Sequence, residues 1–170
     1  IMNSMRNINN QMEVLSSTPV ISKTLDELDF EVSYYIIDNF GAIEKYREVP
    51  FSVIWENDHP QVIDVDFYVE ILSPDKVIVS ADHYGDIKVY DYKKDKVVQN
   101  IEKIYFSNEI NPGAKINTEY FAFTIVFNGN YNPDLTEEYK FRFHSKESLI
   151  KKIFFLIAPS ECNTTLLSSP

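Results

Sequence analysis

The stretch VDFYVEILSPDKVIVSA, residues 65–81, decides the fold class of this chain. Apolar side chains alternate with others through VDFYVEIL (residues 65–72) and KVIVSA (residues 76–81), and Pro74 and Asp75 stand between the two runs. A period of two is that of an extended strand with one buried face, and proline and aspartate favour turn geometry. The stretch therefore predicts two antiparallel strands joined by a turn.

The same alternation recurs along most of the chain. It runs through FEVSYYII (30–37), AIEKYRE (42–48), FSVIWE (51–56), IKVYDY (87–92), KVVQNIEKIYF (96–106), YFAFTIVFN (120–128) and YKFRFH (139–144). Turn-forming residues stand between several of these runs, among them Asn39, Gly41, Pro50, His59 and Pro60. The pattern predicts an antiparallel meander of about eight or nine strands, a number that favours a sandwich or jelly-roll-like pair of sheets.

Helical signals lie at the two ends of the chain. Ile8, Met12 and Leu15 predict a helix over 7–16, and Thr18 before Pro19 predicts the start of a second helix over 19–28. Ser145 is a capping residue for a third helix, after which an extended piece is expected over 154–168. The predicted class is α+β, a mainly antiparallel sandwich with two N-terminal helices and one C-terminal helix, in one domain spanning 1–170.

Composition excludes several classes of function. The chain has 170 residues and a net charge of -10, which would repel a phosphate backbone, so no nucleic-acid partner is expected. Its four glycines are widely separated, so no phosphate-binding loop and no cofactor are expected. Cys162 is the single cysteine, so no intramolecular disulfide can form.

No apolar run approaches the roughly 20 residues that a membrane span needs. The longest is IFFLIAP, residues 153–159. The chain as given is therefore expected to be soluble. Because it begins at Ile1 and not at methionine, it is also expected to be an excised or trimmed piece of a longer protein, with any anchor or signal outside it.

Acidic and histidine residues give weak candidates for chemistry. Asp64 and Asp66, two apart on a predicted strand, have the spacing of an acid–base or cation-binding pair, although a solvated strand face is favoured. Asp82, His83 and Asp86 in the predicted loop SADHYGD are candidate metal ligands, but His59 and His144 lie in unrelated segments and no ligand spacing is recognisable. No nucleophile motif occurs either. We expect no catalytic, cofactor-binding or metal-binding residue and no enzymatic activity in this segment.

Three further features are candidates for contacts at the surface. Asn163 begins an N-glycosylation triplet, which has meaning only in a secretory eukaryotic context. Lys151 and Lys152 beside the apolar run are candidates for a membrane surface, although a solvated helix end is favoured. Some aromatic residues could stack on sugar rings, although cross-strand packing is favoured for them; they are Trp55, Tyr68, Tyr84 and Tyr90.

The opening residues 9–35, NNQMEVLSSTPVISKTLDELDFEVSYY, resemble a segment of a known membrane-protein family. The segment follows the first transmembrane helix in polysaccharide co-polymerases of the Wzz chain-length-determinant type, including Wzc-like proteins that add a cytoplasmic tyrosine kinase. The matching positions are Glu13, Val14, Leu15, Ser16, Ser17, Val20, Ile21, Leu25 and Leu28. Ser16 departs from the pattern, because the family's residue at this position is usually basic.

The resemblance covers nearly the whole chain. EKYREVPFSV (44–53) resembles the x-E-x-Y-x-x-x-P-F-x-V element of the Wzc-like branch of Bacteroidetes-type bacteria. The branch's order and spacing are also followed by EYFAFTI (119–125), YKFRFHSKESLIKK (139–152) and APSECNTTLLSS (158–169). The family's helical arm, its second membrane helix and any kinase motif have no counterpart in these residues.

The resemblance implies a non-catalytic domain at the bacterial inner membrane, facing the periplasm and close to the membrane. Its implied role is to regulate the chain length and export of a capsular, exo- or O-antigen polysaccharide by scaffolding the polymerase as a homo-oligomer. The implied partners are that polymerase, the glycan and, through flanking helices, the membrane. Helix residues Met12, Leu15, Ile21 and Leu25 are expected to be structural. A secreted carbohydrate-binding β-sandwich is the alternative.

Overall fold

The computed structural model of the chain describes residues 30–46, 48–132 and 137–157, and these divide between two compact units. Residues 31–145 form the larger unit, which consists of strands. The other unit comprises 1–30 and 146–170, and within it helix α3 (Lys146–Ile157) is described. The helices expected over 7–16 and 19–28 lie outside the described residues.

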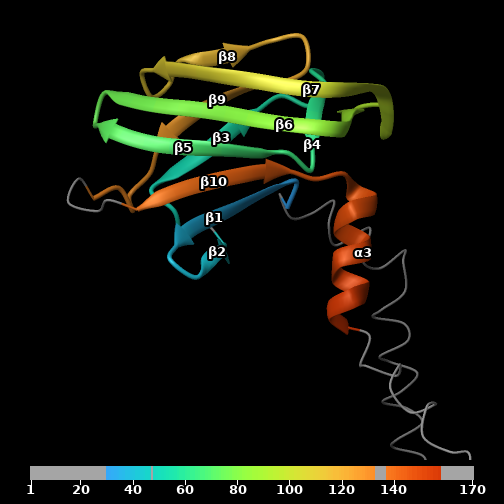
Figure 1. Cartoon of the computed structure of the whole chain (residues 1–170), viewed down its shortest axis with the longest axis horizontal. Helices are drawn as coiled ribbons and strands as arrows, with labels where there is room; N and C mark the ends of the chain where they lie inside the picture. Colours follow the sequence, from blue (N-terminus) through green and yellow to red (C-terminus); the bar gives the residue numbers. More distant parts are fainter. Residues whose placement is uncertain (1–29, 47, 133–136, 158–170) are drawn as a thin grey trace, which may run out of the picture. The chain divides into compact units, whose positions relative to one another are not determined.

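The strand unit contains ten strands among the described residues, coloured in chain order in Figure 1. Their bounds are β1 Val32–Asp38, β2 Gly41–Lys45, β3 Phe51–Trp55, β4 Gln61–Ile63, β5 Asp66–Ser73, β6 Lys76–Asp91, β7 Lys96–Ile110, β8 Lys115–Asn117, β9 Ala122–Phe127 and β10 Glu138–Phe143. All their pairings are antiparallel. The antiparallel β class predicted from the alternating pattern is therefore confirmed.

The connectivity differs from the predicted meander. A seven-stranded sheet has the order β2-β1-β10-β5-β6-β4, with β7 also paired to β6, and a three-stranded sheet has the order β3-β9-β8. The last strand, β10, thus lies between β1 and β5, and β3 pairs with β9 instead of with a neighbour in the chain. Alternation sets which face a residue occupies but carries no information about partners distant in the sequence, so the meander was wrong.

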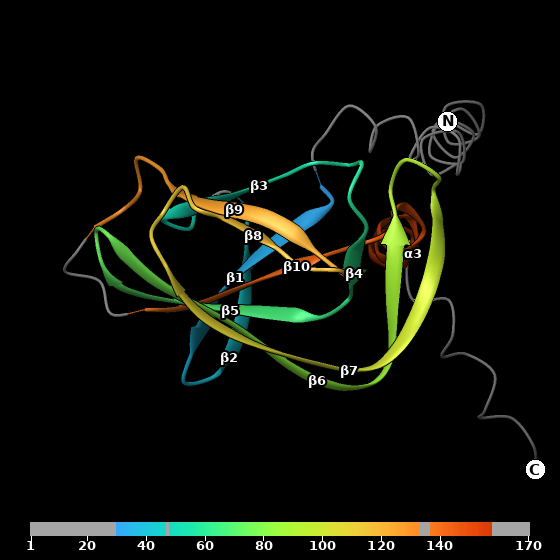
Figure 2. The same ribbon diagram turned by 90° about the horizontal axis from the view of Figure 1, so that it is seen from above.

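The predicted loop at 82–86 is also corrected. The runs 76–81 and 87–92 belong to the single strand β6, which continues through these residues and pairs along its length with β7. The pairing register shifts between Tyr84 and Ile87, and Figure 2 shows the two strands bending together as a ribbon. A bulge adds an extra residue to one strand and increases its bend. Here it interrupts the alternation of apolar residues, which is why the sequence pattern indicated a loop. The short strands β4 and β8 were missed.

One aromatic core joins the two sheets. Phe67 of β5 is fully buried, and its ring centroid lies 5.0 Å from that of Phe121, 5.2 Å from that of Phe123 and 5.1 Å from that of Phe141. Hydrogen bonds also connect the sheets, because the Val53 amide donates to the Tyr34 hydroxyl at 3.1 Å. The alternating strands therefore bury their apolar faces against each other, and their other faces are left for contacts outside the core.

Helix α3 begins directly after Ser145, as the sequence predicts. Leu149 is buried beside Ile150, Ile153 and Phe30, and an ion pair of 2.6 Å joins Glu147 to Lys151. The helix continues to Ile157, so the extended piece expected from residue 154 is wrong for its first four residues, and 158–168 lie outside the described part. Within the described residues, no helix has the length and apolar character needed to cross a membrane.

Candidate functional site

The outward side of the seven-stranded sheet carries a row of tyrosine and lysine side chains. Tyr35 of β1 lies opposite Lys140 of β10, and Lys140 lies opposite Tyr68 of β5. Directly opposed residues project on the same side of a sheet. Tyr68 is 44% exposed, whereas its neighbours Phe67 and Val69 are buried, so this side faces away from the core.

The row continues onto the β6–β7 ribbon. Tyr68 lies opposite Ser80 of β6, and residues two and four positions further along, Asp82 and Tyr84, project on the same side as Ser80. Asp82 in turn lies opposite Tyr105 of β7, which is 72% exposed. We call this surface the tyrosine face and define it by the four tyrosines that it presents, which are Tyr35, Tyr68, Tyr84 and Tyr105.

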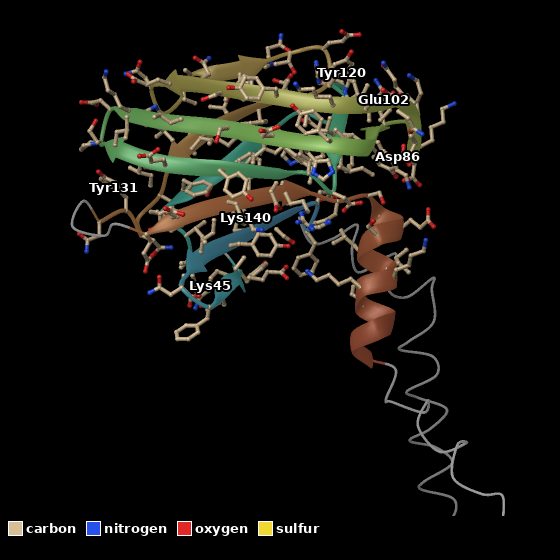
Figure 3. The ribbon with its side chains drawn as sticks, in the orientation of Figure 1. Lys45, Asp86, Glu102, Tyr120, Tyr131 and Lys140 are labelled. Atoms are coloured by element: carbon tan, nitrogen blue, oxygen red, sulfur yellow. The ribbon has the colours of Figure 1, made fainter. Side chains whose placement is uncertain are left out.

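A charged cluster lies between the first two rings of this face. Asp66 Oδ2 accepts a hydrogen bond of 2.8 Å from Lys140 Nζ, and Asp66 Oδ1 accepts from Arg142 Nε at 2.8 Å. Burial alone would raise the pKa of Asp66, but the hydrogen bonds from Lys140 and Arg142 outweigh it and hold the pKa below its ordinary value of 3.8. Both oxygens of the carboxylate therefore accept hydrogen bonds from cations of β10. Figure 3 shows Lys140 on this strand.

Lysine side chains also lie over three of the four rings. Lys140 Nζ is 5.3 Å from the centroid of Tyr35, and Lys103 Nζ is 4.7 Å from that of Tyr84 and 5.8 Å from that of Tyr105. The hydrogen bond to Tyr84 raises the pKa of Lys103. Because such contacts favour a cation over the ring face, they fix the orientation of the rings that they touch.

The substitution Asp66→Asn is expected to lower the free energy of unfolding by about 2 kcal/mol near neutral pH, because it leaves two half-buried cations without their counter-ion. The folded-state pKa of Asp66 lies below its ordinary 3.8, so its contribution is complete above that value and is lost as the pH falls through the folded pKa. Urea unfolding at several pH values measures this difference between wild type and variant.

The matched control for this substitution is Asp86→Asn. Asp86 is exposed and lies where the β6–β7 ribbon bends, near Glu102 (Figure 3). Asp86→Asn is expected to change the free energy of unfolding by no more than about 0.5 kcal/mol. An equal effect of both substitutions, or a gap between wild type and Asp66→Asn that widens in acid, would contradict the assignment.

The structure does not bring Asp64 and Asp66 together as a pair on one strand. Asp64 lies between β4 and β5 with a φ of 60°, and its Oδ1 is 3.0 Å from Nδ1 of the buried His144. Asp66 is bound by the two β10 cations. The left-handed backbone of Asp64 interrupts the strand, so the i, i+2 rule that placed both carboxylates on one face fails there.

The candidate metal ligands are likewise separated. Asp82 and His83 are consecutive residues of β6 and therefore project on opposite sides, and Asp86 lies within the bulge between Tyr84 and Ile87. His59 Nδ1 is 2.7 Å from the Pro60 carbonyl oxygen, far from His144 in the chain. Within the described ranges, no group of three or more His, Cys, Asp or Glu side chains is arranged to hold a metal ion.

Two of the four aromatic candidates belong to the core and two to the tyrosine face. Trp55 packs on Tyr92 with a centroid distance of 4.5 Å, and Tyr90 is buried. Tyr68 and Tyr84 are exposed on the tyrosine face. Packing in the core is therefore confirmed for Trp55 and Tyr90, whereas Tyr68 and Tyr84 stay exposed.

The other surface candidates are also placed. Lys151 and Lys152 are exposed on α3. The triplet beginning at Asn163 and the helix residues Met12, Leu15, Ile21 and Leu25 lie outside the described residues.

Sequence reasoning missed Tyr35, Tyr105 and Lys140. A signal was available for the first two, because each stands in a strand at a position that alternates with apolar residues. No sequence signal joins Lys140 to Tyr35 and Asp66, since it needs the pairing of β10 with both β1 and β5.

Comparisons with known proteins find no relative. No family model matches the chain, and neither the curated proteins nor the solved structures contain a match.

Proposed function

We propose that this chain is the periplasmic, membrane-proximal part of a polysaccharide co-polymerase of the Wzz and Wzc-like type. It acts without catalysis, by holding copies of itself and a polysaccharide polymerase in a fixed arrangement at the bacterial inner membrane. That arrangement influences the length of the exported glycan. The proposal is supported by the segments quoted above, which follow the family's order over nearly the whole chain, and by how the strand unit connects to the rest.

The observation that carries the proposal is that the chain enters and leaves the strand unit at one place. Val32, the first residue of β1, lies directly opposite Phe143, the last residue of β10. Just beyond them, the His144 amide donates to the Glu31 carbonyl oxygen at 2.8 Å. Opposed Cα atoms in an antiparallel pair are only about 5 Å apart.

Adjacent ends are what a domain inserted between two membrane anchors requires. Both flanking segments, 1–30 and 146–170, start from neighbouring points, so both can lead to the same membrane surface without spanning the strand unit. Because its two ends are adjacent, the strand unit can also be deleted and replaced by a short linker. The membrane anchors, the homo-oligomer and the polymerase partner belong to the full-length protein under this proposal, and no nucleic acid takes part.

Replacing residues 32–143 in the full reading frame by a linker of a few glycine and serine residues tests the proposal. Because the ends are adjacent, we expect the shortened protein to insert in the membrane at the wild-type level. We expect the length distribution of the surface polysaccharide to change as it does when the whole gene is deleted. Gel electrophoresis of the extracted polysaccharide measures the distribution, and membrane fractionation measures the insertion.

The control for this experiment is full-length protein carrying Asp86→Asn, which should keep the wild-type length distribution. If the shortened protein, present at its normal level, gave the wild-type length distribution, the strand unit would have no role in regulating polysaccharide length. Apolar spans of about 20 residues on both sides of this segment are also required by the proposal.

A secreted carbohydrate-binding sandwich is the second candidate, favoured by the exposure of Tyr68 and Tyr84 on one sheet face. The same reading frame separates the two proposals. A cleavable signal peptide before residue 1 and surface polysaccharide that is unaffected by the excision would favour the secreted module.

A further inference from the structure

We propose that the tyrosine face binds a neutral polysaccharide segment that lies across the strands. The inference deepens the proposed function, and it depends on that function only for the identity of the polymer. It rests on three properties of the face, which are the spacing of its rings, the balance of charge between them and the fixed orientation of their side chains.

The rings recur on every second strand. The sheet order places β10 between β1 and β5, and β6 between β5 and β7, so Tyr35, Tyr68 and Tyr105 stand on alternate strands of five. Neighbouring strands are about 4.8 Å apart, which separates successive ring positions by roughly 10 Å across the sheet. That separation is comparable to the length of a disaccharide, so an extended glycan crossing the strands would meet the rings at a regular interval.

Charged groups of both signs fill the strands between the rings. On β10, Lys140 and Arg142 share Asp66, with an Arg142 Nη2 to Asp66 Oδ1 distance of 2.7 Å. On the ribbon, Lys103 stands close enough to Asp82 for that carboxylate to contribute to its raised pKa. Such pairs can donate hydrogen bonds to hydroxyl groups and accept them, which suits an uncharged sugar.

An acidic polymer gains little from this face. The two cations of β10 are already bound to a carboxylate, and the chain as a whole carries a net charge of -10. A polyanion approaching the face would therefore meet repulsion over long distances, and both β10 cations at contact already share the Asp66 carboxylate. The balance of charge thus favours a neutral glycan over an acidic one.

The setting of the rings also favours a sugar over a protein surface. The centres of protein interfaces are depleted in lysine and aspartate. Here charged residues adjoin every ring, with Lys140 over Tyr35 and Lys103 over both Tyr84 and Tyr105. The cations hold these three rings in place before a ligand arrives, which reduces the entropy that binding must remove.

The test is titration calorimetry of the 170-residue chain with three probes. They are a neutral β-linked glucan hexasaccharide, an acidic hexasaccharide of uronic acids, and oligosaccharides cut from the surface polysaccharide of the bacterium that carries the gene. We expect millimolar or tighter binding of a neutral probe. The double variant Tyr68→Ala/Tyr105→Ala should weaken that binding roughly tenfold or more, which corresponds to about 1.4 kcal/mol.

Two further variants keep the result interpretable. Tyr68→Phe retains the ring and should lose much less affinity than Tyr68→Ala. Phe40→Ala removes a fully exposed ring in the β1–β2 turn, off the tyrosine face, and should bind as wild type. Thermal unfolding checks that the double variant is folded, as expected for residues that are 44% and 72% exposed.

Four outcomes would overturn the inference. They are no binding of any neutral probe, equal affinity of wild type and the folded double variant, tighter binding of the acidic probe, and capture of a protein strand by the face in place of sugar. A length change on excision of residues 32–143 without glycan binding would sink only this inference. Glycan binding without a length change would sink only the proposed function.

Discussion

Phe67→Ala is expected to lower the free energy of unfolding by about 4 kcal/mol, the middle of the range for removing a buried aromatic ring. Phe67 is fully buried in β5, and its ring stacks on Phe141 with an interplanar angle of 10°. It also meets two rings edge-on, those of Phe123 in β9 and of Phe121 directly before β9. Truncation therefore leaves a cavity where the two sheets meet, and the surrounding rings cannot close it without leaving their own contacts.

Thermal and urea unfolding of the 170-residue chain measure this effect. At this size 1 kcal/mol shifts the midpoint by about 2–4 °C, so a fall of roughly 10 °C is expected. The matched control is Ile54→Ala on β3, which removes a side chain that is 56% exposed and should cost less than about 1 kcal/mol. Similar losses from both substitutions would mean that the aromatic cluster does not join the sheets.

Gln61→Leu is the second large expected effect, a loss of about 3 kcal/mol in the free energy of unfolding. Gln61 of β4 is fully buried, and its Nε2 donates to the Ala122 carbonyl oxygen at 2.8 Å. Its Oε1 accepts from the Ala122 amide at 3.2 Å. The leucine is similar in size but satisfies neither group, so two buried backbone groups of the other sheet lose a partner.

The substitution Gln61→Glu keeps the side-chain volume and changes the hydrogen-bonding groups, so it separates their contributions to stability. A protonated carboxyl can both donate and accept, but burial raises the folded-state pKa of such a group above its unfolded value of about 4.3. The stability of this variant relative to wild type is thus highest in acid and falls as the pH rises through the folded pKa.

Urea unfolding from pH 4 to pH 8 measures the Gln61 substitutions. Gln99→Leu, on the exposed strand β7, is the control and should be nearly neutral. A stabilising role for the two Gln61–Ala122 hydrogen bonds would be ruled out if Gln61→Leu were as stable as wild type. The same would follow if Gln61→Glu gained stability with rising pH.

The alternating pattern determined most of the strands and most of their inward faces. In VDFYVEIL the residues Phe67 and Val69 are buried and Tyr68 is exposed, as a period of two requires. The helix after Ser145 was also readable, because capping and a 3.6-residue period are local signals. Local signals failed where the backbone departs from regular geometry, at Asp64 and at the bulge after Tyr84.

Tertiary structure alone decided which strands are neighbours, and the candidate site depends on that. Asp66 meets Lys140 and Arg142 because β10 inserts between β1 and β5. These two cations follow Asp66 by 74 and 76 residues in the chain. The same insertion spaces Tyr35 and Tyr68 and brings Val32 opposite Phe143.

The two differ for a physical reason: whether a residue is buried depends on local sequence, whereas which strand lies beside it depends on the whole chain. Burial of one face follows from the order of apolar and polar residues, so the sequence by itself determined strand and face. Partner choice follows from how the whole set of aromatic faces packs most densely between two sheets, a property of the assembled core that no single segment encodes.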